Sequence, residues 1–264
     1  MFPRAKKSFG QNFLADPSVV GKIVAAAGIK PGERVLEIGP GTGVLTRGLL
    51  ETGARVTAVE ADADLLPALR ETFPGLDLRE GDVLALRGQD PSLNGTLEEG
   101  GYVLAANIPY NITSGILEEF LRVSPRPKRL VLMVQREVAD RITAAPPQVS
   151  LLSVVCQTYA EAKKAFNVPA GAFRPVPKVD SAVIVLELRP KTAGEPDPED
   201  VIALAKAGFS SPRKQLHKNV AQAGLMDSVA AKALLEGLGL RPDIRAEGLT
   251  AAQWQNLWKK WKTG

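Results

Sequence analysis

The strongest constraint on the fold of this chain is a regular alternation of strand-like and helix-like segments along its first 190 residues. Short runs rich in β-branched residues and leucine are followed by segments in which apolar residues recur at helical spacing. The strand-like runs are 34–38, 55–60, 76–79, 102–106 and 129–134, and the helical patterns are 44–50, 64–73, 114–121 and 136–142. Repeated strand–helix units of this kind predict an α/β fold, a mainly parallel sheet with helices on both faces.

The pattern changes at both ends of this region. Asp16 and Pro17 are a typical N-cap and first helical residue, and they predict a helix that ends at Gly28. Residues 165–168 and 182–188 both resemble strands, but only a proline-rich turn separates them, so we expect an antiparallel pair at the edge of the sheet. Residues 87–101 contain Asn-Gly and Gly-Gly pairs and are predicted to form a surface loop.

A proline- and glycine-containing segment, 190–198, predicts a boundary between domain 1–190 and domain 191–264. The first domain carries 22 Lys and Arg against 21 Asp and Glu, whereas the second carries 11 against 8 and is therefore the basic part. The second domain is helical by pattern. Its last helix places Trp254, Leu257, Trp258 and Trp261 on one apolar stripe, and this spacing favours core packing over stacking on bases.

Two residue types occur only once, and they exclude whole classes of site. With Cys156 as the only cysteine, neither an intrachain disulfide nor a cysteine-based metal site is possible. His217 is the only histidine, which excludes histidine-rich zinc sites, and its basic surroundings predict a surface helix position. The apolar stretch 19–29 is interrupted by Lys22, so we expect no signal peptide, no membrane span and a cytoplasmic location.

A glycine-rich turn follows the first strand of the predicted sheet. Residues 34–43 (RVLEIGPGTG) describe a buried strand that runs into a turn and opens a helix, which is where open α/β sheets bind ligands. The next strand ends at Glu60, whose carboxylate can accept both hydroxyls of a ribose, and the third is followed by Asp82, which can accept from an adenine amino group. These features predict an adenosine-containing cofactor, either NAD or S-adenosylmethionine. Val44 stands where the dinucleotide fingerprint requires glycine, which counts against NAD.

The fourth strand ends in Asn107-Ile108-Pro109-Tyr110, which resembles the N-x-P-Y motif of methyltransferases that modify exocyclic amino groups of adenine. The N6 lone pair of adenine is delocalised into the ring, so the nitrogen is a poor nucleophile until its hydrogens are held by acceptors. The side-chain oxygen of Asn107 and the backbone carbonyl of Ile108 or Pro109 are candidate acceptors. Proline stiffens the turn, and Tyr110 can stack on a flipped base.

These motifs together resemble known families. The spacing Glu37-x-Gly39-x-Gly41-x-Gly43 is similar to the loop of class I S-adenosylmethionine-dependent methyltransferases, whose Rossmann-like seven-stranded sheet also ends in an antiparallel hairpin. Residues 7–16 (KSFGQNFLAD), the glycine loop, residues 107–110 and residues 173–181 (FRPVPKVDS) resemble the ribosomal RNA adenine N6-dimethyltransferase family over residues 7 to about 188. The resemblance implies a catalytic group of Asn107, Pro109, Tyr110 and Phe173. It also implies cofactor contacts from Gln11, Asn12, Leu14, Gly39, Gly41, Glu60, Asp82, Val83 and Asn107.

The C-terminal domain favours one branch of that family. Residues 208–220 (GFSSPRKQLHKNV) are similar to a segment of the KsgA (RsmA) enzymes, which act on small-subunit RNA, although Pro212 replaces an arginine of the pattern. The resemblance implies N6,N6-dimethylation of two adjacent adenosines near the 3′ end of 16S ribosomal RNA during ribosome biogenesis, by a monomer acting on an assembling 30S particle. Arg213, Lys214 and Lys218 are candidate phosphate contacts, and the N-terminal Arg4, Lys6 and Lys7, with no acid near them in sequence, are weaker ones.

Two alternatives remain open at this point. Large-subunit methylases of the erythromycin-resistance type share most of the motifs of the first domain. The other alternative is a non-catalytic RNA-binding assembly or transcription factor with the same fold. The intact motif at residues 107–110 argues against it.

Overall fold

The computed structural model describes residues 5–6, 9–190 and 192–263, and it separates into two compact units. The first unit consists of two stretches of the chain, up to residue 139 and residues 163–188. The second unit consists of residues 140–162 and of the chain from residue 189 onward. Each unit has its own apolar core. The linker expected at residues 190–198 begins just after the third point at which the chain passes between the units, at residues 188 and 189.

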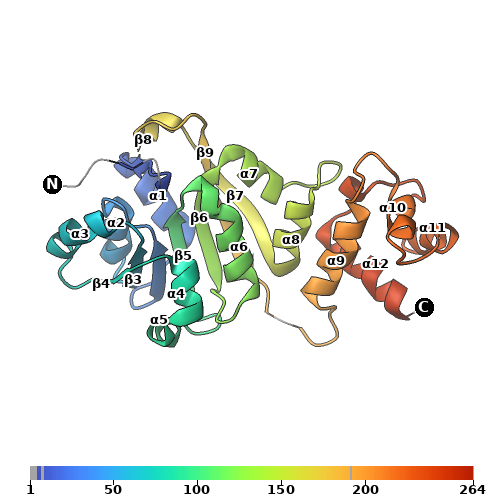
Figure 1. Ribbon diagram of the computed structural model, residues 1–264, viewed down its shortest axis with the longest axis horizontal. Coiled ribbons are helices and arrows are strands. Elements are labelled where there is room, and N and C mark those ends of the chain that lie inside the picture. The colour runs from blue at the N-terminus through green and yellow to red at the C-terminus, as the bar shows by residue number, and fades with distance from the viewer. Residues whose placement is uncertain (1–4, 7–8, 191, 264) are drawn as a thin grey trace. The chain divides into compact units, whose positions relative to one another are not determined.

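A single seven-stranded sheet forms the frame of the first unit, in the order β4-β3-β2-β5-β6-β9-β7 (Figure 1). Strand β2 pairs in parallel with both β3 and β5, whereas β9 runs antiparallel to β6. The predicted mainly parallel sheet with an antiparallel edge is therefore confirmed. The strands are β2 (Arg34–Ile38), β3 (Arg55–Glu60), β4 (Asp77–Glu80), β5 (Tyr102–Asn107), β6 (Arg129–Gln135), β7 (Ala160–Val168) and β9 (Ser181–Leu188).

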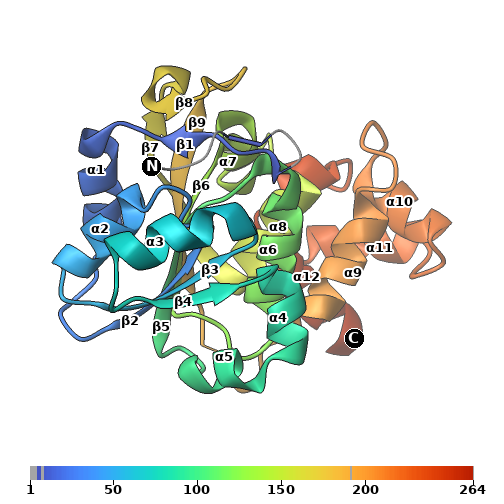
Figure 2. The same ribbon diagram turned by 60° about the vertical axis from the view of Figure 1, so that its left-hand side comes forward.

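Helices cover both faces of this sheet, with α1 and α2 on one side and α4 and α6 on the other (Figure 2). The first helix begins as predicted, because Asp16 accepts a hydrogen bond from the Ser18 N–H and Pro17 occupies the first turn. It ends at Gly28, whose φ of 55° is in the left-handed region. The helices are α1 (Pro17–Ala27), α2 (Val44–Glu51), α3 (Leu66–Thr72), α4 (Val83–Gln89), α5 (Pro91–Thr96), α6 (Thr113–Arg122) and α7 (Arg136–Ile142).

The expectation of a surface loop over residues 87–101 is wrong for its first half. Helix α4 continues to Gln89, and α5 occupies residues 91–96. The reason is local: Asp90 caps α5 by accepting from the Ser92 N–H, and Pro91 takes the first helical position. This is the same start signal as Asp16-Pro17, and it outweighs the Asn-Gly pair near the end of the helix.

The second unit is built mainly from helices around a core of its own. Trp254 is fully buried and stacks at a tilt against Phe209, with the ring centroids 5.9 Å apart, while Leu257 is also buried. Trp258 and Trp261 pack against the same core, so the predicted packing role of the tryptophan stripe is confirmed. The helices are α8 (Leu151–Tyr159), α9 (Pro198–Gly208), α10 (Leu216–Gln222), α11 (Ser228–Glu236) and α12 (Ala251–Thr263).

The predicted surface position of His217 is wrong. Its side chain is buried, with Nδ1 2.6 Å from the Ser228 hydroxyl and Nε2 2.9 Å from the Gln215 amide oxygen. Burial lowers the pKa of this imidazole. The flanking basic residues suggested an exposed helix face, but His217 lies on the opposite, inward face beside Leu216. Within the described residues, no helix is long and apolar enough to cross a membrane.

Candidate active site

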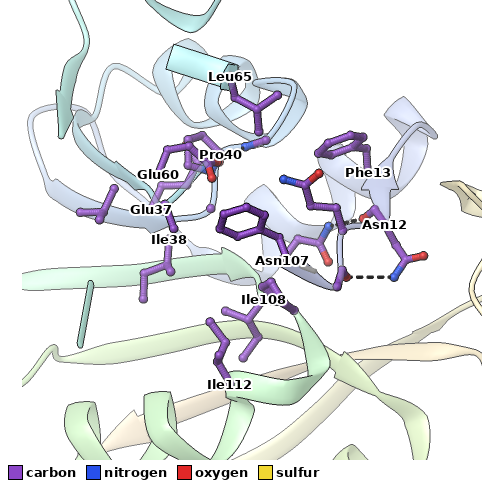
Figure 3. Close-up of a pocket in the computed structure, with 18 of the residues that line it drawn as sticks. Asn12, Phe13, Glu37, Ile38, Pro40, Glu60, Leu65, Asn107, Ile108 and Ile112 are labelled. Atoms are coloured by element: carbon purple, nitrogen blue, oxygen red, sulfur yellow. Dashed lines mark hydrogen bonds between the residues drawn. The ribbon is translucent and has the colours of Figure 1, made fainter. Parts of the chain in front are cut away.

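One cavity of about 400 Å³ lies beyond the ends of strands β2, β3 and β5 in the first unit (Figure 3). Its position is the ligand site expected of an open α/β sheet, and its volume suits a nucleoside-sized ligand. The structure brings every residue predicted for the site to this one cavity. The lining includes Gln11, Asn12, Leu14, Gly39, Gly41, Glu60, Asp82, Val83, Asn107, Pro109, Tyr110 and Phe173.

The three glycines of the loop after β2 have different physical reasons. All three have positive φ values, between 60° and 76°. A Cβ on Gly43 would lie 2.3 Å from the Phe73 ring, and one on Gly41 would lie 3.0 Å from the Phe13 ring. A Cβ on Gly39 would meet nothing within 4 Å, so this glycine borders open cavity space. Gly43 and Gly41 therefore allow the loop to pack closely against the two phenylalanine rings, whereas the missing side chain at Gly39 leaves space in the cavity.

Glu60, at the end of β3, is held in place by two backbone donors. Its Oε2 accepts from the Gly41 N–H at 3.0 Å and its Oε1 from the Asp62 N–H at 2.9 Å. Burial raises the pKa of this carboxyl above its ordinary value. Each oxygen keeps a second lone pair, so the carboxylate is fixed yet still able to accept from a ligand.

Glu37, inside β2, is a charged residue of the cavity lining that was not among the predicted site residues. Its side chain is 1% exposed, and its Oε2 has no hydrogen-bond partner among the described residues. Burial, reinforced by the negative charge of Glu60, raises the pKa of Glu37 to about 8. The available signal was a carboxylate in the middle of an otherwise apolar buried strand, which is costly unless a partner is supplied.

This buried carboxyl predicts how stability depends on pH. Between pH 4.5 and about 8 the folded protein keeps a proton on Glu37 that the unfolded chain has lost, so the free energy of unfolding falls as pH rises through this window. Glu37→Gln removes that slope. Between pH 5 and pH 8.5, the difference in the free energy of unfolding between Glu37→Gln and wild type should change by a few kcal/mol in favour of the variant, because each pKa unit corresponds to about 1.4 kcal/mol. Denaturant unfolding of both proteins at the two pH values measures it, and parallel pH profiles would contradict it.

Asp82 and Val83 follow β4 and line the cavity, and β3 and β2 lie between β4 and β5, the strand that ends in Asn107. Asp82 is exposed and caps α4 by accepting from the Leu84 N–H at 3.0 Å. Val83 is buried. The cap fixes the direction of the carboxyl group, which leaves Asp82 able to accept from a ligand donor as well.

The orientation of the Asn107 carboxamide is fixed by the backbone of another segment. Its Nδ2 lies 3.2 Å from the Asn12 carbonyl oxygen (Figure 3). A carbonyl oxygen can only accept, so the amide nitrogen must face Asn12 and Oδ1 takes the other direction. In the following turn, the Pro109 carbonyl accepts from the Ile112 N–H at 3.1 Å. Of the two backbone carbonyls considered for the amino group, that of Pro109 thus already accepts one hydrogen bond within the turn.

Two aromatic residues flank this turn. The Tyr110 hydroxyl is 2.8 Å from the Ser181 hydroxyl, which anchors the ring at its polar end. Phe173 lines the cavity but is only 1% exposed and belongs to the apolar core. It begins the two-residue strand β8 (Phe173–Arg174), which pairs with β1 (Phe13–Leu14). Phe173 therefore has a packing role in addition to its place in the wall.

The N-terminal basic residues differ from expectation where the structure describes them. Lys6, thought to lack a nearby acid, has its Nζ 2.6 Å from carboxylate oxygens of both Asp62 and Asp64. That expectation was wrong because the acids lie 56 and 58 positions away in sequence. Arg4 and Lys7 lie outside the described residues.

Comparison with known proteins gives a consistent result. The family model described as ribosomal RNA adenine dimethylase matches residues 3–262. A ribosomal RNA small subunit methyltransferase A of Synechococcus sp. (strain JA-3-3Ab) is 43% identical, with 97% of this chain and 92% of that protein covered.

Two crystal structures share the fold. A dimethyladenosine transferase from Plasmodium falciparum has a TM-score of 0.80 at 26% identity, covering 95% of this chain and 98% of that one. The 23S rRNA methyltransferase ErmE has a TM-score of 0.76 at 28% identity, covering 95% and 100%. With its glycine loop and its Asn107 motif gathered at one cavity, the chain belongs to the ribosomal RNA adenine dimethylase family.

Proposed function

We propose that this protein transfers methyl groups from S-adenosylmethionine to the N6 atoms of adenosines in small-subunit ribosomal RNA, dimethylating each target base. The observation that carries the proposal is the Asn107 carboxamide, whose orientation is fixed at the edge of a cavity that also contains two buried carboxyl groups. The Pro109 carbonyl already accepts one hydrogen bond within the turn, so we assign Oδ1 of Asn107 and the carbonyl of Ile108 as the preferred acceptors of the two amino hydrogens.

The cavity residues fit S-adenosylmethionine. Glu37 Oε2 is a buried acceptor that has no hydrogen-bond partner among the described residues, a good match for a donor group of a cationic ligand. Glu60 is fixed for ribose hydroxyls, and Asp82 for the adenine amino group. When bound, S-adenosylmethionine supplies an electrophilic methyl group on a sulfonium centre. The absence of a side chain at Gly39 leaves room for a ligand beside β2.

The chain's own groups then act on the base. Tyr110 stacks on the flipped adenine, while Asn107 and Ile108 hold its amino hydrogens away from the ring plane, which makes the nitrogen lone pair available. After one methyl transfer the nitrogen loses one proton to solvent and keeps one hydrogen, and one of the two acceptors suffices to hold it. This is how a single site supports a second methylation of the same atom.

The choice of substrate RNA rests on the relatives. The Synechococcus protein at 43% identity is named for the small subunit, whereas ErmE, named for 23S RNA, is 28% identical. We therefore assign the activity to small-subunit RNA. From the resemblance in sequence we further propose two adjacent adenosines near the 3′ end of 16S RNA as the targets, an assembling 30S particle in the cytoplasm as the substrate, and a monomer as the active form. The non-catalytic alternative gains no support from a cavity whose acceptors are all in place.

Transfer assays test the proposal. The purified full chain is incubated with methyl-labelled S-adenosylmethionine and with small-subunit particles, large-subunit particles or the naked RNAs. Label should enter small-subunit RNA as N6,N6-dimethyladenosine. Label in 23S RNA alone would favour the resistance-type alternative, and no transfer to any RNA would favour a non-catalytic role.

A basic segment of the second unit is the proposed phosphate contact. Arg213, Lys214 and Lys218 are all exposed at the start of α10. The turn that carries the first two is held by buried Asn219, whose Nδ2 donates to the carbonyls of Gly208 and Ser211, at 2.5 and 3.1 Å. Arg213 and Lys214 are thus carried by a fixed turn and Lys218 by the helix that follows it. All three are exposed, and Lys214 Nζ donates to the Gln222 amide oxygen at 3.1 Å. Exposed positive charges on a fixed backbone suit phosphate recognition.

Replacing Arg213, Lys214 and Lys218 together with glutamine should weaken RNA binding and flatten its salt dependence. Each lost phosphate contact removes a slope of about 0.7 to 0.9 in log K against log salt. Cofactor affinity should stay unchanged, because none of the three lines the cavity. Filter binding across a salt series measures the slope. An unaltered slope would mean that these residues are an ordinary solvated helix face.

A further inference from the structure

Asp62 is a buried charged residue that the mechanism above does not use. Its side chain is 1% exposed. Oδ1 accepts from Lys6 Nζ at 2.6 Å and from the Asp64 N–H at 3.2 Å, and Oδ2 accepts from Gln11 Nε2 at 2.8 Å. Burial opposes ionisation, but the hydrogen bonds from Lys6 and Gln11 outweigh it and hold the pKa of this carboxyl below its usual value.

The segment that Asp62 holds is the strap, which we define as residues 9–15. At its N-terminal end, both amide atoms of Gln11 are engaged, because Nε2 donates to Asp62 and Oε1 accepts from the Lys6 N–H at 2.7 Å. At its other end, Leu14 pairs with Phe173 and the Ala15 N–H donates to the Ala172 carbonyl at 2.8 Å. The strap is thus attached at two points to the body of the first unit.

Asn12 lies between these two attachments, and its carbonyl is the group that orients Asn107. Gln11 is its direct neighbour in the chain, so the position of the Asn12 carbonyl depends on the hydrogen bond between Gln11 and Asp62. Asp62 also donates its N–H to Glu60. One residue therefore connects the carboxylate proposed for the cofactor ribose with the amide proposed for the target base.

We propose that Asp62 is a positioning residue for methyl transfer, which fixes the strap through Gln11 and thereby orients the Asn107 carboxamide. This inference rests on the proposed function, because it is the adenine amino group that makes the orientation of Asn107 matter. Gln11 then acts through its position in the strap, with both of its amide atoms bound within the protein.

A reciprocal exchange of donor and acceptor tests the link. Asp62→Asn keeps an oxygen for the Asp64 N–H but turns an amide nitrogen toward Gln11 Nε2, so two donors face each other. Gln11→Glu instead places two carboxylates together. The double variant restores an N–H···O hydrogen bond of reversed direction, while the remaining oxygen of Glu at position 11 still accepts from the Lys6 N–H.

Each single variant should lower the single-turnover rate at saturating RNA and cofactor by about 10- to 100-fold, the effect of a small misplacement of a catalytic group. The double variant should recover most of this loss. Asp64→Asn is the matched control, because Asp64 also contacts Lys6 but has a side chain that is 63% exposed, and the hydrogen bonds described for the Gln11 side chain go to Asp62 and Lys6. Its rate should stay within about twofold of wild type, as for most surface substitutions.

A second readout does not depend on activity. The side-chain NH₂ signals of Asn107 in an amide NMR spectrum, identified by their loss in Asn107→Ala, should shift in both single variants and return in the double variant. Unchanged signals in the single variants, near wild-type rates in both, or a double variant no better than the singles would each overturn the inference. Signals that shift and return while wild type transfers no methyl group to any RNA would support the link to Asn107 and refute the proposed function instead.

Discussion

Asn107→Ala is expected to lower the single-turnover rate of methyl transfer by about 10² to 10³-fold, the range seen when one preorganised polar group is removed from an active site. The Asn107 carboxamide is held by the Asn12 carbonyl before any substrate arrives. Its contribution should therefore appear in the transition state, and RNA affinity should change little. Rates measured at saturating RNA and cofactor separate the two effects.

Two comparisons make this result specific. Asn167→Ala, on the edge strand β7, removes an exposed asparagine that does not line the cavity, and it should leave the rate unchanged. Tyr110→Ala should weaken capture of the base as well as turnover, since stacking contributes about 1–3 kcal/mol per base. If Asn107→Ala methylates RNA at nearly the wild-type rate under saturating conditions, the asparagine is only a turn residue and the mechanism is wrong.

Glu60→Ala is expected to weaken S-adenosylmethionine binding by more than 100-fold. The variant loses two charge-assisted hydrogen bonds to the ribose, worth about 1.5–3 kcal/mol each. It also leaves the N–H groups of Gly41 and Asp62 without their present acceptor, which loosens the loop around the cofactor. Isothermal calorimetry with the purified full chain measures the dissociation constant directly.

The matched control is Glu80→Ala. Glu80 is the register partner of Glu60 on the neighbouring strand β4, but it is exposed and does not line the cavity. Its replacement should leave cofactor affinity unchanged. An equal affinity in Glu60→Ala and wild type would remove Glu60 from the cofactor site, and NAD binding comparable to that of S-adenosylmethionine would contradict the choice of cofactor.

The features of this fold that the sequence predicted are those set by local pattern. Strands β2 and β3 begin and end at the predicted residues, because a buried parallel strand is a continuous apolar run with clear ends. Parallel strands also bring their carboxyl ends to one edge of the sheet. For that reason Gly39, Glu60 and Asn107, spread over 69 positions of sequence, were expected together and do line one cavity.

The features that the sequence did not predict depend on contacts between distant segments. The pairing of β1 with β8 joins residues about 160 positions apart, and neither two-residue strand has a period that can be recognised. The same holds for the ion pair of Lys6 with Asp62, which changes a basic residue expected to be free into part of a buried network. The predicted surface position of His217 was wrong because it was based on the basic neighbours in sequence, whereas burial depends on which face of α10 packs inward.

The most direct test of the central claim is nucleoside mass spectrometry of both ribosomal RNAs from a strain that lacks this protein. The account predicts that N6,N6-dimethyladenosine disappears from 16S RNA, returns when the wild-type gene is restored and does not return with Asn107→Ala. Modifications of 23S RNA should be unaffected. Undiminished N6,N6-dimethyladenosine in the 16S RNA of that strain, or its loss from 23S RNA alone, would contradict the account.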